Sequence, residues 1–446
     1  MMNNELRPYD EYSETGINWI ENIPSTWKIA KNSVLFREIV DTGHSELELL
    51  SILQNKGIVK QSSTGRKIRK AEENQSYKRI CKGDIGYNLM NAFMGAIGAS
   101  KYEGIISPAY AVCRPKININ VWYYHYLFRT ELYKSEFNKN SYGIMYERNR
   151  LYFDRFKNIY AIIPSRTEQD QIVKYLDHKL SKINKFIIAK KKLISVLEEQ
   201  KQVIINEVVT KGLDPNVRMR PSGVDWIGDV PEHWSNVRLR FLCSIKTGDK
   251  DTINRVDNGR YPFYVRSPHV ERIDTYTFDG EAILTAGDGV GAGKVFHYAN
   301  GKFDYHQRVY NLHNIKSILP EYLYYYLKAN FYKEIEKGNA KSTVDSIRLP
   351  MLKNFQILFG DYDEQEAILN YIKANEKYFD ESIASIKKEL ALILEYKNTL
   401  ISDVVTGKVD VRHIEVDETE EGIIKETDFD DISIDEDAGE TEESDD

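Results

Sequence analysis

The chain has 446 residues, of which 41% are hydrophobic and 12% aromatic, a composition that can fill the cores of more than one domain. Its three cysteines are too few for a disulfide framework, and no run approaches the 18 apolar residues of a membrane helix. These features exclude a disulfide-rich or membrane-spanning protein and favour a reducing cytoplasm.

The net charge of −7 averages two regions of opposite sign. Residues 415–446 carry 17 acidic side chains against one lysine, whereas residues 1–414 carry 60 Lys and Arg against 51 Asp and Glu. The last stretch, assigned as an acidic tail over residues 409–446, is predicted to be disordered because it cannot bury a core. The basic body is typical of a nucleic-acid binder, although a lysine-rich composition alone would explain its charge equally well.

The chain repeats itself. The motif Gly-x-x-Trp-Ile-x-x-Ile-Pro-x-x-Trp over residues 16–27 returns 207 residues later over residues 223–234, with valine in place of the second isoleucine. Two similar frames therefore carry two divergent inserts. We expect, in chain order, an N-terminal segment (1–27), a first insert (28–163), a long helix (164–212), a connector with the repeated motif (213–234), a second insert (235–359), a second long helix (360–408) and the tail.

Both inserts are predicted to be α+β globules. Short β-branched runs broken by Gly, Asn and Pro indicate strands, for example Val295–Tyr298 turning at Asn300-Gly301 as a hairpin. The tyrosine-rich stretches 121–137 and 320–335 have helical spacing and are predicted to be core helices.

Two segments, 168–210 and 364–406, read as long amphipathic helices. Thr167 and either Asp361 or Asp363 are expected to cap their starts, and Gly212 and Gly407 to stop them. Apolar residues at alternating three- and four-residue steps predict a coiled coil rather than two helices packed separately. The predicted seam comprises Ile172, Leu176, Ile183, Ile187, Ile194, Leu197, Ile204, Val208, Ile368, Ile372, Phe379, Ile383, Ile386, Leu390, Ile393, Leu400 and Val404.

Lysines interrupt this seam at Lys201 and Lys397, which occupy the same position in the two copies. A parallel in-register pair would place the two ammonium groups side by side, so an antiparallel pairing is favoured.

Motifs for catalysis are missing from the sequence, which has no His-Glu-x-x-His or Cys-x-x-Cys spacing and no paired prolines. The glycine cluster over residues 287–294 fits a loose dinucleotide pattern, but Asp288 and Val295 depart from the phosphate loop. We interpret it as a tight turn, with phosphate contacts through backbone amides as an alternative.

Base edges in DNA are read by Arg or Lys on guanine, Asn or Gln on adenine, and Ser or Thr on either. Loops of the two inserts are rich in these residues, each of which could also be an ordinary solvated side chain. The candidates in the first insert are Lys60, Gln61, Ser63, Arg66, Lys67, Arg69, Lys70, Arg148, Asn149 and Arg150. Those in the second insert are Lys246, Lys250, Arg255, Arg260, Arg266, Ser267, His269, Arg272, Gln307, Arg308, Lys341, Ser342, Thr343 and Arg348.

Up to about residue 411 the chain resembles the specificity subunits of type I restriction-modification systems. The resemblance is carried by the repeated motif, by Lys82-Gly83-Asp84-Ile85 and Tyr261-Pro262-Phe263 in the inserts, and by the two helices that start with Glu-Gln and end with Val-Val-Thr. It implies two target-recognition domains in a pseudo-twofold arrangement, joined by an antiparallel coiled coil. Each domain would read one half of a bipartite double-stranded DNA target.

The resemblance also implies partners and the absence of catalysis in this chain. Two modification subunits would use S-adenosylmethionine, and restriction subunits would use ATP and Mg²⁺. The alternatives from other classes are a nucleotide- or S-adenosylmethionine-binding enzyme that uses the Gly287–Gly293 loop, and a coiled-coil adaptor whose inserts bind proteins.

Overall fold

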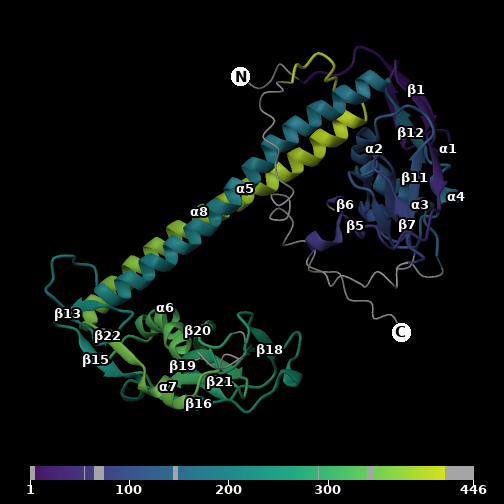
Figure 1. Cartoon of the computed structure of the whole chain (residues 1–446). Helices are drawn as coiled ribbons and strands as arrows, with labels where there is room; N and C mark the ends of the chain where they lie inside the picture. The colour runs from purple at the N-terminus through teal and green to yellow at the C-terminus, as the bar shows by residue number, and fades with distance from the viewer. Residues whose placement is uncertain are drawn as a thin grey trace. The chain divides into compact units, whose positions relative to one another are not determined.

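The computed structural model describes residues 6–54, 56–64, 75–143, 149–289, 291–338 and 346–416 (Figure 1). The chain forms two compact units. Unit 1 comprises residues 1–191 and 387–446, and unit 2 comprises residues 192–386. Each unit therefore holds one insert together with a segment of both long helices.

Unit 1 mixes short strands and helices, in agreement with the predicted α+β class. Its largest sheet has the order β4-β11-β8-β9, all antiparallel: β4 (Phe36–Ile39), β11 (Tyr110–Pro115), β8 (Ile85–Asn88), β9 (Ile97–Ala99). Unit 1 also has four two-stranded antiparallel sheets. Two of them are β1 (Tyr12–Ile17) with β2 (Ile20–Pro24), and β3 (Lys28–Lys31) with β12 (Tyr160–Ile163). The other two are β5 (Leu50–Leu53) with β6 (Gly57–Lys60), and β7 (Lys78–Ile80) with β10 (Gly104–Ile106). Its short helices are α1 (Asn32–Leu35), α2 (Val121–Leu127), α3 (Glu131–Asn140) and α4 (Phe153–Phe156).

Unit 2 is built around a six-stranded sheet of order β16-β21-β19-β20-β17-β18. Its strands are β16 (Ser244–Thr247), β21 (Val309–His313), β19 (Phe278–Ala286), β20 (Phe296–Tyr305), β17 (Tyr261–Tyr264) and β18 (Glu271–Ile273). Two smaller pairs and two helices complete it: β13 (Met219–Pro221) with β14 (Asp229–Pro231), β15 (Ser235–Arg238) with β22 (Gln356–Phe359), α6 (Pro320–Gly338) and α7 (Leu349–Asn354).

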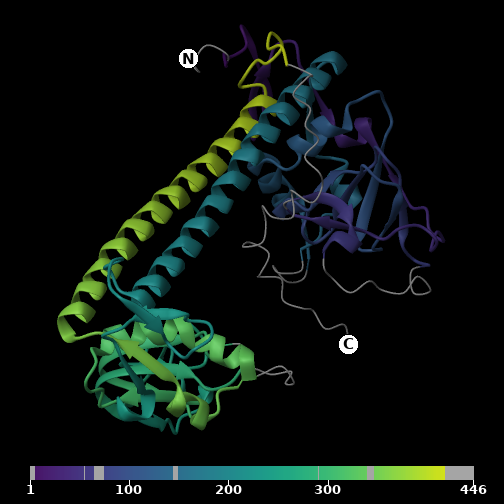
Figure 2. The ribbon, with the colours of Figure 1, turned by 60° about the vertical axis from the view of Figure 1, so that its left-hand side comes forward.

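The long helices are α5 (Arg166–Lys211) and α8 (Tyr362–Val405), close to the predicted ranges. In unit 1, Lys397 donates to Asn184 and Lys190 pairs with Glu389, so the numbering rises on one helix as it falls on the other. In unit 2, Lys201 pairs with Asp380. Both views show the two helices side by side within each unit (Figure 2).

All the predicted seam residues are buried or partly buried. The antiparallel direction seen within each unit agrees with the prediction, while the supercoiling of a coiled coil stays a prediction.

Residues that recur in the two copies of the sequence make equivalent hydrogen bonds in the two units. Gln169 and Gln365 each accept a hydrogen bond of 2.8 Å from a backbone amide, that of Asn120 in unit 1 and that of Leu319 in unit 2. Each also donates a bond of 2.9 Å to the carbonyl five residues earlier. Both glutamines are 1% exposed, so these bonds satisfy polar groups that water cannot reach.

The two tryptophan motifs hold the ends of the long helices. Gly212 and Gly407 end α5 and α8 with φ angles of +76° and +82°, in the left-handed region that favours glycine. A Cβ atom on Gly407 would lie 2.9 Å from the Trp27 ring, and one on Gly212 would lie 3.4 Å from the Trp234 ring. The first tryptophan motif therefore packs against the C-terminal end of α8, and the second packs against the C-terminal end of α5.

Several local predictions are wrong. The turn expected at Asn300-Gly301 does not form, because β20 continues through it and Gly301 pairs with Gly280 on β19. Both glycines have positive φ angles. Their backbones can therefore distort locally while the two strands continue, and no turn is needed. Thr130, whose side chain caps α3, divides the helix expected over residues 121–137 into α2 and α3.

The cap predicted at Thr167 is also wrong. Helix α5 starts at Arg166, two residues before the predicted start, and Ser165 accepts a hydrogen bond from the amide of Glu168. At α8 the prediction of Asp361 is confirmed, since its side chain accepts from the amide of Glu364 at 2.9 Å.

Residues 409–416, assigned from sequence to the acidic tail, pack on unit 1. Val411 is fully buried in the core of unit 1, and the backbone of Asp410 forms an isolated antiparallel β-bridge with that of Arg7 near the N-terminus. Residues 417–446 lie outside the described residues.

Candidate nucleic-acid interface

Unit 2 gathers two predicted DNA-contacting arginines around one carboxylate. Arg266 follows β17, Arg308 precedes β21, and Asp288 lies in the loop after β19. The Nη1 atoms of Arg266 and Arg308 donate to different oxygens of Asp288, at 3.0 and 2.5 Å. The arginine side chains are 44% and 60% exposed, and that of Asp288 is 24% exposed. These three residues are called the Asp288 triad below.

A second cluster adjoins the triad along the chain. Gln307 donates to Asp251 at 2.6 Å through its side chain and to the carbonyl of Lys250 at 2.7 Å through its backbone. His306 lies 3.7 Å from Asp251 and accepts a bond from the amide of Arg308. Residues 306–308 therefore connect four of the predicted DNA-contacting residues in one surface region.

The glycine-rich loop around Asp288 is held by close backbone packing. A Cβ atom on Gly291 would lie 2.4 Å from the carbonyl oxygen of Arg266, and one on Gly293 would lie 2.1 Å from the Ile335 side chain. The amide of Ile347 donates to the carbonyl of Gly287 at 2.8 Å. The loop leads into strand β20, whereas phosphate loops lead into a helix N-terminus. This favours the tight-turn interpretation and leaves the nucleotide-binding alternative without support.

Charge pairing sets the protonation of this region. Burial raises the pKa of Asp288, but hydrogen bonds from Arg308 and Arg266 lower it more, so that its pKa lies below the ordinary value. Burial lowers the pKa of His306. The negative Asp251 and Asp288 raise this pKa and the positive Arg266 and Arg308 lower it, and the net result is a pKa below the ordinary value. At neutral pH the triad is ionised and carries a net charge of +1.

Other predicted residues of unit 2 lie in different surroundings. Arg272 donates to the backbone carbonyls of Gly259 and Arg260, which makes it a structural residue of the β17–β18 region. Arg255 is 3.6 Å from Asp257 and 3.8 Å from Glu271.

The remaining candidates in unit 2 are scattered. Lys246 is exposed on β16, Ser267 donates to the carbonyl of His269, and Arg260 and Arg348 are exposed. Lys341, Ser342 and Thr343 fall outside the described residues.

In unit 1, Lys60, Gln61 and Ser63 lie at the end of β6 and in the short 3-10 helix η1 (Gln61–Thr64) that follows. The Lys60 ammonium is 3.0 Å from Glu48 and 5.5 Å from the centre of the Tyr102 ring, and Ser63 donates to the Lys60 carbonyl. Arg66, Lys67, Arg69, Lys70 and Arg148 lie outside the described residues.

Asn149 and Arg150 occupy a place with a counterpart in unit 2. The amide of the next residue, Leu151, donates to the carbonyl of Leu89 at 2.8 Å, just after β8. The bond from Ile347 to Gly287, just after β19, is its equivalent, with the donor 196 residues and the acceptor 198 residues further along the chain. Each unit thus ties a predicted recognition segment to the turn that follows a central buried strand.

Sequence reasoning missed Asp251, Asp288 and His306, because it searched for donors to bases and passed over the carboxylates that hold them. A signal was present: Asp288 interrupts the glycine cluster at a position where a simple turn needs no charge.

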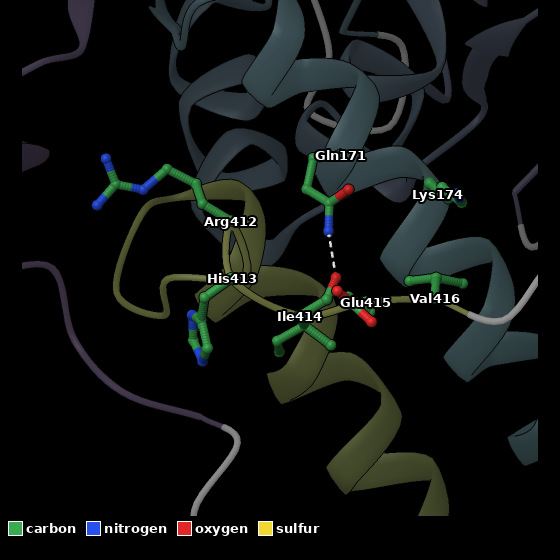
Figure 3. Close-up of a pocket in the computed structure, with 7 residues that line it drawn as sticks. All are labelled: Gln171, Lys174, Arg412, His413, Ile414, Glu415 and Val416. Atoms are coloured by element: carbon green, nitrogen blue, oxygen red, sulfur yellow. Dashed lines mark hydrogen bonds between the residues drawn. The ribbon is translucent and has the colours of Figure 1, made fainter.

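A shallow cavity of about 490 Å³ lies in unit 1 between the start of α5 and the segment 411–416 (Figure 3). Its polar lining includes Lys174, Arg412 and His413, and Gln171 donates to the carbonyl of Ile414 at 2.7 Å. The cavity marks where the C-terminal segment docks on α5. Within the described ranges, no group of three His, Cys, Asp or Glu side chains is arranged to hold a metal, and no helix could cross a membrane.

Comparison with known proteins gives this surface a context. The sequence model of the type I restriction modification DNA specificity domain matches residues 231–392. The second insert and helix α8 up to residue 392 therefore resemble a type I DNA specificity domain. Two similar proteins are the specificity subunit of the type I restriction enzyme EcoDI from Escherichia coli, 28% identical over 41% of the chain, and that of MjaVIII from Methanocaldococcus jannaschii, 25% identical over 58%. The matches span 40% and 64% of those relatives' lengths.

One solved structure supports the fold. A chain from a study of complex assembly and conformational transition of the type I R-M system matches with a TM-score of 0.64 and 16% identity, over 86% of this chain and 99% of that one. The HsdS subunit from Thermoanaerobacter tengcongensis matches over 86% of this chain and 98% of its own length, with 16% identity and a TM-score of 0.45.

Proposed function

We propose that this chain is the DNA-recognition subunit of a type I restriction-modification complex and reads a bipartite double-stranded DNA target. The observation that carries the proposal is the repeated frame. Equivalent bonds of Gln169 and Gln365 are formed in both units, yet the two inserts present different polar side chains from equivalent loops. A single scaffold that carries two different surfaces suits a target with two unlike halves.

The chemistry of the surface in unit 2 supports DNA as the ligand. Lys250, Arg266, Gln307 and Arg308 offer the cationic and amide donors that read guanine and adenine. They lie in a chain body of net charge +9, which favours association with the phosphate backbone.

Exposed apolar side chains on the long helices support protein partners. Tyr378 is 65% exposed and Leu392 is 58% exposed on α8, and Val203 is 56% exposed on α5. We infer that two modification subunits dock on the helices, and that restriction subunits join the full complex. S-adenosylmethionine, ATP and Mg²⁺ would be bound by those partners, and this chain would perform no catalysis. Its three free cysteines agree with work in a reducing cytoplasm.

The test is to express the chain with its modification subunits in a host free of other methyltransferases and to map methylated bases across the genome. We expect one motif with two defined halves and a fixed unspecified gap, and no methylation by the purified chain alone. Methylation without a defined motif, or robust methyl transfer by the isolated chain, would contradict the proposal.

A further inference from the structure

We propose that the Asp288 triad reads guanine in the half of the DNA target recognised by unit 2, with Asp288 as the positioning residue for Arg266 and Arg308. This inference rests on the proposed function and assigns a chemical specificity to one surface region.

The geometry of the hydrogen bonds suits this role. A guanidinium has five N–H donors in a rigid plane, and a bidentate contact to guanine O6 and N7 uses two of them. The bond from each arginine to Asp288 runs through Nη1. It restrains the direction of the guanidinium and leaves the Nε–Nη2 edge with the donors that match guanine. An arginine oriented before binding loses less side-chain entropy when DNA arrives.

Asp288 is itself held firmly, as a positioning residue must be. Its backbone pairs with Ser346 in an isolated bridge, and the neighbouring Gly287 bonds to the backbone of both Arg308 and Ile347, at 2.7 and 2.8 Å. Glycines at 289 and 291 let the loop approach Arg266 closely. The carboxylate is therefore fixed relative to both arginines by backbone contacts.

The carboxylate also argues for a base edge over a phosphate. A phosphate contact needs only positive charge, and an ionised aspartate bonded to both guanidinium groups halves the charge of the triad from +2 to +1, which weakens its attraction for a phosphate. The edge of a G·C pair offers two acceptors on guanine and an amino donor on cytosine, which complements two arginines beside one carboxylate. Two guanidinium groups on one carboxylate can span neighbouring base pairs, which are about 3.4 Å apart.

The test compares methylation motifs of complexes that carry Arg266→Lys, Arg308→Lys or Asp288→Asn. Each lysine variant keeps the charge but loses the bidentate fork, so we expect the preference for a guanine in the second half-site to fall about ten- to hundredfold. Asp288→Asn should relax the same positions because the arginines lose their orientation. The half-site of unit 1 should be unchanged.

Matched controls are Arg240→Lys, an exposed arginine of unit 2 that bonds Asn354, and Asp229→Asn, an exposed aspartate on β14. Both should retain the wild-type motif. Thermal melting of each variant separates misfolding from altered reading, and Arg308, at 60% exposed, is the variant least able to disturb the fold.

Three outcomes would overturn the triad. One is an unchanged motif in all three variants. Another is a uniform loss of affinity for every sequence with a salt dependence reduced by about one charge, the signature of a phosphate contact. The third is tighter binding to all DNA by Asp288→Asn with discrimination intact, which would make Asp288 a mask over the arginines. A wild-type complex that methylates no defined motif would instead refute the proposed function itself.

Discussion

Tyr123 donates a hydrogen bond of 2.8 Å to the carbonyl of Val405, 282 residues further along the chain. Tyr322 makes the equivalent bond of 3.0 Å to the carbonyl of Val209. In both units an aromatic helix of the insert therefore closes on the last turn of one long helix. Both tyrosines are fully buried, so each bond satisfies a helix-terminal carbonyl that would otherwise lack a partner.

These bonds should contribute measurably to stability. Tyr123→Phe should lower the free energy of unfolding of unit 1 by about 1–2 kcal/mol, because it leaves a buried carbonyl unpaired. Tyr322→Phe should cost at least as much in unit 2, since Tyr322 also lies 3.2 Å from the carbonyl of Leu358. Urea unfolding measures both, with Tyr378→Phe, on an exposed side chain, as the control. A Tyr123→Phe protein as stable as wild type would contradict this account.

The two seam lysines have unlike partners, which leads to a second prediction. Lys201 bonds to the carboxylate of Asp380 at 2.9 Å, whereas Lys397 bonds to the amide oxygen of Asn184 at 3.0 Å. Burial, and then the positive Arg129, lower the pKa of Lys397. Asn184→Asp would supply the missing carboxylate, and we expect a gain of about 1 kcal/mol at pH 7, because the lysine charge is already buried. The reciprocal Asp380→Asn should cost about 1 kcal/mol or less, since the Asp380 side chain is 63% exposed.

The pH dependence checks the same site. In the wild type the folded pKa of Lys397 lies below the ordinary lysine value of 10.5, so this lysine makes stability rise with pH between those two values. In Asn184→Asp the pKa should be raised, and the added stability should disappear as the pH rises through the new value. Unfolding curves at pH 7 and at about pH 10 measure the difference, and an unchanged gain at both would be evidence against the ion pair.

The inserts should be exchangeable units. Strands β3 and β12 pair with each other at the two ends of the first insert, Lys28 opposite Ile163, so residues 28–163 carry their own closing strands. Replacing them with the equivalent insert of a relative should change one half of the methylated motif and leave the other half and the gap unchanged. A simultaneous change in both halves would refute modular reading.

The long helices should act as a spacer between the two half-sites. Inserting seven residues after Lys191 in α5 and seven after Ile386 in α8 adds close to two helical turns, so the apolar seam stays nearly in phase. The added length is about 10 Å, which corresponds to roughly three base pairs. We expect the unspecified gap to grow by that amount in methylation mapping. Seven residues in α5 alone should abolish activity, because α5 would become about two turns longer than α8 and the pairs Lys397–Asn184 and Lys201–Asp380 could not both form. Full activity with an unchanged gap in the double insertion would exclude a spacer role.

Periodicity made the long helices predictable almost to the residue, because a seam repeated over many turns is a strong signal and Gly212 and Gly407 stop it. Local turn chemistry misled at Asn300-Gly301, where pairing with β19 overrides the preference of that dipeptide for a hairpin. Local sequence alone also misleads at Arg272. As a basic loop residue it is predicted to contact DNA, but its guanidinium donates hydrogen bonds to two backbone carbonyls.

The sequence by itself determined the duplicated frame, the two long helices and the pool of polar residues in the inserts, since these follow from repeats and spacing along the chain. Only the tertiary structure decided which polar residues act together. Arg266, Asp288 and Arg308 come from three separate loops, and their pairing depends on the strand order that brings those loops together. Hydrogen bonds and ion pairs form between neighbours in space, and no local pattern encodes a contact between loops 20 or more residues apart.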